Sequence, residues 1–295
     1  MPVLNKHDTC HLGGQAPQTP GAGFARILKL RGMAEGPDLG RGVLYQRAAA
    51  SRFELRKYPP SAVLAPFVDY YWLVRWDLRG QPAYEQAVLP HPNVHLAFEP
   101  EQTAIYGVST RLFQRKIEGR GATLGVRFWP GGFRPWWHQP IARLTDRVVD
   151  AGGLLGEAAG PVRQAVIGEP DDAVVVGRAQ ALLESIRPEP DPVAGEVAAM
   201  AARIVSDSGL RRVDELAATL GVPVRRLQRL FADYVGVSPK WVMRRARLHE
   251  AALAAEQGPV DWAALAADLG YSDQAHLTRD FTAAIGEPPA RYAAD

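Results

Sequence analysis

The chain has 295 residues, 47% of them hydrophobic, and a formal net charge of +2. This length predicts two domains with packed cores, and the small net charge does not by itself indicate an acidic or basic partner. A single cysteine, Cys10, excludes a disulfide framework and a cysteine-rich zinc site. The sequence has neither the ~18 consecutive apolar residues of a membrane span nor a signal peptide at its start. We therefore expect a cytoplasmic protein without a membrane partner.

Residues 1–45 are rich in glycine and proline, which predicts a mostly disordered extension with a short helix around Phe24–Leu30. Residues 46–186 are predicted to form a β-rich domain, a small sheet or barrel, with helices appended at its C-terminal end. Its strands are expected in short β-branched or aromatic runs bounded by glycine and proline, which are Tyr70–Val74, Val94–Glu99, Thr103–Ser109 and Thr123–Pro130.

Helical periodicity runs from Ile141 to Ile186 and is clearest in Asp171–Ile186. Residues 187–193 contain three prolines among alternating charges, which is typical of a stiff, solvated linker. Residues 194–295 are predicted to be almost entirely helical. The expected fold class is therefore α+β, with an N-terminal β-rich domain and a C-terminal all-α domain.

The C-terminal domain contains an internal repeat. Leu216 and Gly221 recur 49 residues later as Leu265 and Gly270. Five further positions of the first copy recur after 50 residues, namely Leu227, Arg229, Phe231, Gly236 and Pro239. Each copy consists of a short helix, a turn with glycine and a longer helix, which is the outline of a helix-turn-helix unit.

A long helix is predicted between the two copies, over Pro239–Gln257, with Ser238 as its N-cap and Gly258 as its stop. Its 19 residues span ~28 Å at 1.5 Å per residue. A rod of this length can hold two recognition helices about one turn of DNA apart, ~34 Å. The repeat therefore predicts that one monomer enters two successive major grooves.

The first recognition helix carries apolar residues on one face and the predicted DNA contacts Arg225, Gln228 and Arg229 on the opposite face, with the further predicted contact Arg226 at its edge. Guanidinium and amide groups suit base edges and phosphates. The alternative is a plain charged surface helix, which the position inside a repeat disfavours. By the repeat, Ala275, Thr278 and Arg279 take the groove-facing places of the second helix, with His276 at the edge and Gln274 at the N-terminal end. Ser272 is the expected N-cap.

Local charge differs between the copies. Residues 223–248 hold seven basic residues and one acid, a charge of +6, whereas residues 249–295 hold two basic residues and eight acids, a charge of −6. Because phosphate contacts supply much of DNA affinity, the first unit is predicted to bind and read DNA. The second is predicted to contribute less or to face RNA polymerase. Within the long helix, the cluster from Arg244 to Arg247 is divided between phosphate contacts and packing.

These segments resemble the C-terminal DNA-binding domain of AraC/XylS-type transcriptional regulators over Val193–Ala293. The matching motifs are ELAATLGVPVRRLQRLF, GVSPKWV followed by RLHEAA, LAADLGYSDQAHLTRDF and GEPPARY. The resemblance implies two helix-turn-helix units joined by a long helix, which bind double-stranded promoter DNA through the residues just named. Pro223 departs from the family, which often has a serine cap there, and Ala275 offers little side chain for base readout.

The segments AVLPHPNVHLAFEP and GVRFWPGGFRPW resemble an uncharacterised β-rich domain that precedes this module in some bacterial regulators. That resemblance implies a domain that senses a small molecule or forms a homodimer. Five of the seven tryptophans lie in this domain, namely Trp72, Trp76, Trp129, Trp136 and Trp137. For these residues, core packing is favoured over an aromatic ligand pocket. A metal site at His91, His95 and His138 is disfavoured because no carboxylate or further histidine completes it, so we expect no metal and no cofactor.

The predicted function is a sequence-specific DNA-binding transcriptional regulator, controlled by an unidentified ligand at the N-terminal domain. The alternative is an enzyme or DNA-repair protein that carries the same DNA-binding module. It is disfavoured because the single cysteine lies in the N-terminal extension and the sequence has no phosphate-binding loop or Ser–His–Asp set.

Overall fold

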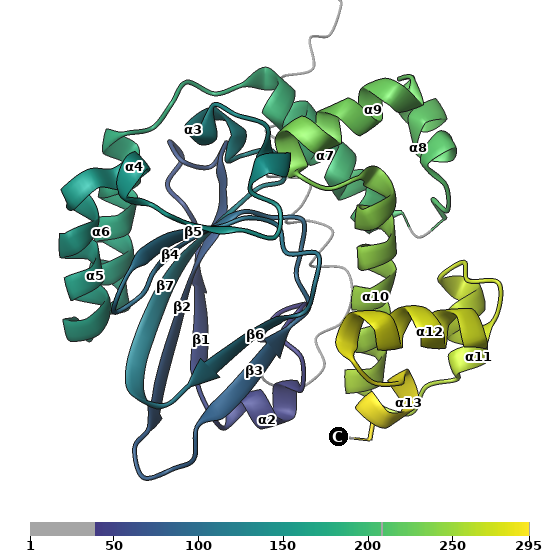
Figure 1. Ribbon diagram of the computed structural model, residues 1–295, viewed down its shortest axis with the longest axis horizontal. Helices are drawn as coiled ribbons and strands as arrows, with labels where there is room; N and C mark the ends of the chain where they lie inside the picture. Colours follow the sequence, from purple (N-terminus) through teal and green to yellow (C-terminus); the bar gives the residue numbers. More distant parts are fainter. Residues whose placement is uncertain (1–38, 208, 295) are drawn as a thin grey trace, which may run out of the picture.

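The computed structural model describes residues 39–207 and 209–294. Its N-terminal part is built on an open antiparallel sheet of six strands in the order β1-β2-β7-β4-β5-β8 (Figure 1). The strands are β1 (Glu54–Tyr58), β2 (Val68–Leu78), β4 (His95–Phe98), β5 (Thr103–Tyr106), β7 (Gly119–Phe128) and β8 (Val148–Asp150). A separate two-stranded sheet pairs β3 (Tyr84–Val88) with β6 (Phe113–Ile117). Of the two predicted architectures, a sheet or a barrel, the described strands form the open sheet.

The four predicted strands correspond to β2, β4, β5 and β7, which lie inside the six-stranded sheet. The edge strand β1 and the pair β3 and β6 were not predicted, because charged residues interrupt their apolar runs. The helical prediction from Ile141 onward was wrong at β8, whose residues pair with β5. Between β7 and the longer helices lie the short elements α3 (Arg134–Trp137), the 3-10 turn η1 (Ile141–Arg143), α4 (Gly152–Leu155) and the 3-10 turn η2 (Gly156–Ala158).

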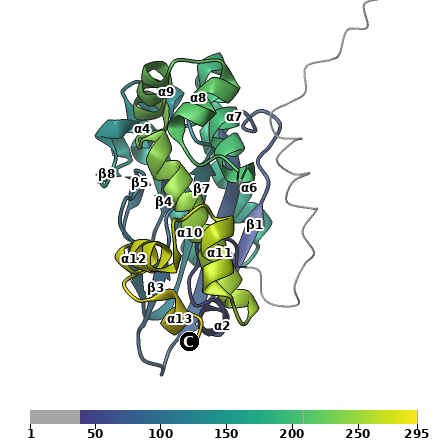
Figure 2. The ribbon, with the colours of Figure 1, turned by 90° about the vertical axis from the view of Figure 1, so that its right-hand side faces the viewer.

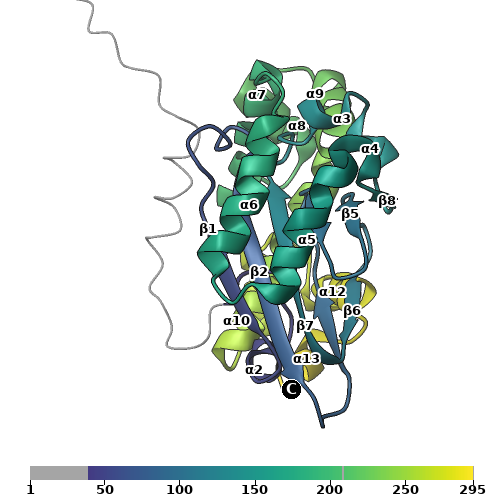
Figure 3. The same ribbon diagram turned by 90° about the vertical axis from the view of Figure 1, so that its left-hand side faces the viewer.

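Helices α5 (Ala159–Gly168) and α6 (Asp172–Ser185) lie side by side and cover one face of the sheet (Figure 3). Strand residues such as Tyr71 and Val126 share one buried core with Val166 and Val175 of these helices. Asp171 caps α6 by accepting a hydrogen bond from the amide of Ala173 at 2.8 Å. The predicted helix Asp171–Ile186 is thereby confirmed to within one residue at each end.

On the other face of the sheet, two tryptophans of β2 lie across glycines of β7. A Cβ atom at Gly125 would come within 1.9 Å of the Trp72 ring, and one at Gly121 would come within 2.3 Å of the Trp76 ring. Trp72 also donates its indole N–H to Nδ1 of His95 at 3.2 Å. These tryptophans are half-buried packing groups, whereas Trp136 lies in the main core.

The predicted disordered extension falls mostly outside the described residues, including the short helix around Phe24–Leu30. Its last residues differ from the prediction, because Leu39 and Leu44 are buried and Val43 forms a β-bridge with Val88. Helix α2 (Gln46–Ala50) follows directly. The packed N-terminal domain therefore begins before residue 46.

The C-terminal part is helical throughout its described residues. Its elements are α7 (Pro192–Ser206), α8 (Val213–Leu220), α9 (Val224–Leu230), the π-helical turn η3 (Phe231–Val235), α10 (Pro239–Gln257), α11 (Trp262–Asp268), α12 (Gln274–Ile285) and α13 (Pro289–Tyr292). Helix α7 begins inside the predicted linker, and α10 has the predicted bounds. In the part of the chain that the structure describes, no helix combines the length and apolar character that crossing a membrane requires.

Candidate nucleic-acid interface

The first helix-turn-helix unit consists of α8, the turn at Gly221 and α9 with its continuation η3. The Glu215 carboxylate accepts hydrogen bonds from the amides of Arg211 and Arg212 at 2.9 and 3.1 Å, which fixes the start of α8. Gly221 ends it in the left-handed conformation, with φ of 65°, a conformation that side chains disfavour. Pro223 occupies the N-cap of α9 without a side-chain hydrogen bond, as the sequence indicated.

The inner face of α9 is anchored, because Leu227 and Phe231 are fully buried against residues of α7, α8 and α10. The outer face presents the predicted contacts Arg225, Arg226, Gln228 and Arg229, all of them exposed. None of their side chains forms an ion pair or hydrogen bond with another residue in the described ranges. This face therefore offers three guanidinium groups and one amide that have no partners among the described residues.

The second unit repeats this construction in α11, the turn at Gly270 and α12. Asp261 caps α11 by accepting from the amides of Ala263 and Ala264 at 3.0 Å. The predicted N-cap of α12 was wrong by one residue. Asp273 holds that position and accepts from the amide of His276 at 2.7 Å, while the Ser272 hydroxyl lies 3.2 Å from Nδ1 of His276.

The outer face of α12 is less suited to DNA than that of α9. Gln274, His276 and Arg279 are exposed and Thr278 is half-buried. His276 is held by Ser272 and by an edge contact with the ring of Tyr271 at 5.0 Å. The N-terminal end of α12 carries the Asp273 carboxylate, whose negative charge disfavours a phosphate at that position. Arg279 remains the one cationic side chain among these predicted contacts.

The arginines of α10 pack the domain. Arg244 forms a bidentate pair with Asp280 of α12, at 2.9 and 2.7 Å. Arg247 donates to the carbonyl of Arg211 at 3.1 Å and lies 5.8 Å from the ring centroid of Tyr271. Arg245 is buried, and this contradicts any phosphate contact by that residue. The exposed Lys240, next to the Ser238 N-cap, is the basic residue of this helix best placed to meet a phosphate.

These contacts also fix the two units relative to each other. Arg247 reaches Arg211, which precedes the first unit, and Tyr271, which belongs to the second. The Arg211 side chain lies so close to the second turn that a Cβ at Gly270 would meet its Cδ at 3.0 Å. Figures 1 and 2 show α9 near the upper end of α10 and α12 beside its lower part. The two recognition helices are therefore held on one rigid support.

The N-terminal domain packs against both units. In the first, Arg134 pairs with Asp233 at 3.0 Å and the Thr145 hydroxyl donates to the carbonyl of Gly236 at 2.7 Å. In the second, the amide of Tyr45 donates to the hydroxyl of Tyr292 at 3.3 Å. Leu44, Ala87 and Leu89 of the N-terminal domain join the core of the second unit. Within residues 39–207 and 209–294, the N-terminal domain thus covers other faces of the two units and leaves the exposed outer faces of α9 and α12 uncovered.

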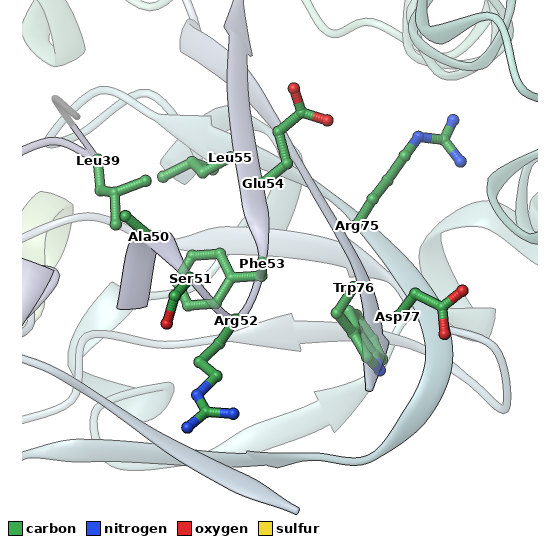
Figure 4. A pocket seen from close by; sticks show the side chains of 10 residues that line it. All are labelled: Leu39, Ala50, Ser51, Arg52, Phe53, Glu54, Leu55, Arg75, Trp76 and Asp77. Atoms are coloured by element: carbon green, nitrogen blue, oxygen red, sulfur yellow. The ribbon is translucent and has the colours of Figure 1, made fainter. Parts of the chain in front are cut away.

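The N-terminal domain has one open groove of about 460 Å³ beside the edge strand β1 (Figure 4). Its apolar lining comprises Leu39, Phe53, Leu55 and Trp76. The charged residues at its rim already have partners, since Arg75 pairs with Asp172 and Asp77 with Arg79. Among the residues described, no group of three His, Cys, Asp or Glu side chains gathers to hold a metal ion. We assign no function to this groove.

Each of the two parts of the chain matches a known family model. Residues 216–295 match a family model described as a helix-turn-helix domain, and residues 56–150 match one described as a domain of unknown function (DUF6597). No curated protein matches the chain.

Solved structures of ToxT from Vibrio cholerae are similar at 9–10% identity. A crystal structure of ToxT at 1.65 Å resolution has a TM-score of 0.37 and covers 82% of this chain and 98% of that one. A structure of wild-type ToxT with a bound unsaturated fatty acid also has a TM-score of 0.37, with 82% of this chain and 91% of that one covered.

Proposed function

We propose that this chain, which ends in an AraC-type helix-turn-helix domain, is a regulator that binds promoter DNA through two helix-turn-helix units of unequal strength. The observation that carries the proposal is the outer face of α9, where Arg225, Arg226, Gln228 and Arg229 are exposed and have no partners among the described residues. Arginine in the major groove favours guanine and glutamine favours adenine.

The division of work between the units follows from charge and from internal pairing. Arg225, Gln228 and Arg229 read bases in one major groove, and Arg226 with Lys240 holds phosphates. In the second unit Arg279 is joined by three uncharged or weakly basic side chains, Gln274, His276 and Thr278, and Asp273 repels phosphate. The second unit orients the protein on the DNA and binds it more weakly. The acidic residues around this unit can contact RNA polymerase.

The N-terminal domain acts as the regulatory part of this proposal. It contacts the first unit through Arg134 and Thr145 and the second through Tyr45. A small molecule or a second copy that shifts this domain would change both units together, because both are held on α10. In this proposal the protein has no catalytic role and acts on DNA in the cytoplasm. The identity of the effector and the formation of a homodimer are questions for experiment.

The test is selection from a pool of random-sequence duplexes by the full chain, with the bound fraction sequenced at two salt concentrations. An enriched motif with a strong block and a weaker block, about 10 base pairs between their centres, is the expected result. Binding that shows no enriched sequence at either salt concentration would contradict sequence-specific recognition.

A further inference from the structure

The recognition helix of the first unit ends in the π-helical turn η3, whereas the recognition helix of the second unit ends as an α-helix. The amide of Gly236 donates to the carbonyl of Phe231, five residues earlier, at 2.8 Å. At the equivalent position of the repeat, the amide of Gly286 donates to the carbonyl of Thr282, four residues earlier, also at 2.8 Å. Two copies of one sequence pattern therefore end their recognition helices in different ways.

The residues at the two ends of the turn do not explain this difference. In both copies a fully buried phenylalanine opens the turn and a left-handed glycine closes it, with φ of 93° at Gly236 and 103° at Gly286. The copies differ between these ends, where the first has Asp233 and Tyr234 and the second has alanines. Because π-helical turns are rare, contacts of the first copy must favour this form over an α-helical turn.

One such contact is made by Arg134 of α3, in the N-terminal domain. Its Nε lies 3.0 Å from the Asp233 carboxylate, and its guanidinium carbon lies 5.6 Å from the ring centroid of Tyr234. The Tyr234 hydroxyl in turn donates to the carboxylate of Asp191, the N-cap of α7, at 2.7 Å. The N-terminal domain therefore binds the turn through the two side chains that the second copy lacks.

A second contact fixes the end of the turn. The Thr145 hydroxyl donates to the carbonyl of Gly236 at 2.7 Å. The space around this glycine is tight, since a Cβ atom there would lie 2.9 Å from that hydroxyl and 3.0 Å from Cγ2 of Ile141. At Gly286, in contrast, no described atom lies within 4 Å of such a Cβ. The N-terminal domain thus encloses the closing glycine of the first unit, while the matching glycine of the second unit is open on that side.

We propose that Arg134 and Thr145 are positioning residues for the DNA interface, because they hold the last turn of the first recognition helix in its π-helical form. Upstream of this turn, α9 is anchored in the core by the buried Leu227. Downstream of it, the Ser238 N-cap of α10 follows Gly236 by two residues. The turn therefore determines where α10 begins relative to α9.

Release of these contacts lets the turn close as an α-helix. The amide of Gly236 then bonds to the carbonyl of Ala232, and the chain beyond it moves by up to one residue, ~1.5 Å along the helix axis. Because α10 carries the second unit, the distance between the two recognition helices changes as well. An event at the N-terminal domain that breaks the contacts is thereby transmitted to the DNA interface. This consequence for DNA rests on the proposed function, whereas the change of hydrogen bond does not.

The first test identifies the acceptor of the Gly236 amide in the full chain, without DNA. Deuterated protein is labelled at the glycine nitrogens and at the carbonyl carbons of phenylalanine or, in a second sample, of alanine. NMR then detects the scalar coupling across the hydrogen bond. In the native chain we expect a coupling from Gly236 to Phe231. In the double variant Arg134→Met, Thr145→Val we expect that coupling to be lost and a coupling to Ala232 to appear.

Tyr45→Phe is the matched control, because it removes a hydroxyl that donates to Glu287 and so loosens the N-terminal domain from the second unit instead. It should keep the Phe231 coupling. Glycine signals away from the turn show whether each variant is folded, and if the double variant is not, the near-isosteric Thr145→Val alone should show both couplings. A folded double variant that keeps only the Phe231 coupling, or a native chain coupled to Ala232, overturns the proposal.

The second test measures the consequence for DNA. Anisotropy titrations compare the native chain with the double variant on the selected duplex and on duplexes whose two blocks lie one base pair closer together or farther apart. We expect the double variant to shift its preference among these spacings. An unchanged preference despite a changed acceptor would overturn the link between the turn and the second unit. If the native chain selects no duplex, the proposed function fails, while the NMR result still decides whether the N-terminal domain holds the turn.

Discussion

The imidazole rings of His91 and His249 stack with their centroids 4.0 Å apart and their planes 7° from parallel. His91 precedes β4 in the N-terminal domain, and His249 lies in α10, so the stack joins the two parts of the molecule. Nε2 of His91 lies 2.7 Å from the carbonyl of Arg41, and Nε2 of His249 lies 3.3 Å from that of Pro90. Both contacts suit neutral rings that donate from Nε2.

This pair predicts that acid weakens the domain contact. Burial is the main cause that lowers the pKa of both rings, that of His249 to about 3. The next cause is the charge of His249 for His91 and the charge of Arg245 for His249, and Arg127 is a smaller cause for both. The separated domains bind protons near the ordinary histidine pKa of about 6.5, whereas the packed form does not. Its stability is therefore complete above pH 6.5 and falls toward pH 3, by at most about 1.4 kcal/mol per pH unit for each ring.

Urea unfolding of the full chain between pH 7.5 and 4.5 measures this loss. His249→Gln should reduce the pH dependence, because it removes one of three buried histidines with a lowered pKa, which are His91, His95 and His249. His138→Gln is the control, since His138 is exposed at the surface. Equal pH dependence in the native chain and His249→Gln would show that the stacked pair does not control the contact.

The two recognition helices are predicted to differ in their response to the same substitution. Arg229→Ala removes a base-reading group from the strongly basic unit and should cost ~1–3 kcal/mol in operator affinity while relaxing the preference at one base pair. Arg279→Ala should cost less. Fluorescence anisotropy with one selected duplex and its single-base variants compares them. A larger loss from Arg279→Ala would reverse the assignment of the stronger unit.

Phosphate contacts are predicted to be recognisable by their salt dependence. Arg226→Ala should weaken binding to all sequences about equally and lower the slope of log Kd against log salt by about 1. Arg245→Met should leave the slope unchanged, because that arginine is buried between the domains. An unchanged slope for Arg226→Ala would place that side chain away from the DNA backbone.

Two glycines, one in the sheet and one in a helix, are predicted to respond oppositely to replacement by alanine. Gly125→Ala would put a methyl group within 1.9 Å of the Trp72 ring and should lower the free energy of unfolding by ~1–3 kcal/mol. Gly177→Ala, in the interior of α6 with open space around it, should raise it by up to about 1 kcal/mol. Chemical unfolding measures both, and a stable Gly125→Ala would mean that Trp72 moves aside without cost.

Much of this architecture follows from local sequence signals. Ser238 and Pro239 mark the start of α10 and Gly258 its end, and the structure has the helix with those bounds. At the start of α12, two neighbouring residues, Ser272 and Asp273, could both serve as the N-cap. The structure has Asp273 in that position. Sequence periodicity places a helix reliably but does not resolve such neighbouring caps.

The burial of Arg245 had no local signal. It depends on the carbonyl of Thr110, 135 residues earlier in the chain, and so on how the two parts of the molecule pack. The edge strand β1 was missed for a related reason, because the sequence ELRKY forms a strand only beside β2. Contacts between segments that are distant in the sequence were therefore the part of the fold and of the candidate site that could not be predicted from the sequence.

Hydroxyl-radical footprinting of the full chain on its selected duplex tests the central claim most directly. If one monomer places α9 and α12 in successive major grooves, two protected blocks will appear on one face of the DNA, about one helical turn apart. The block of the first unit will disappear first as salt is raised. A single protected block at low salt, or protection that wraps around the duplex, would contradict binding by two units held on one rigid helix.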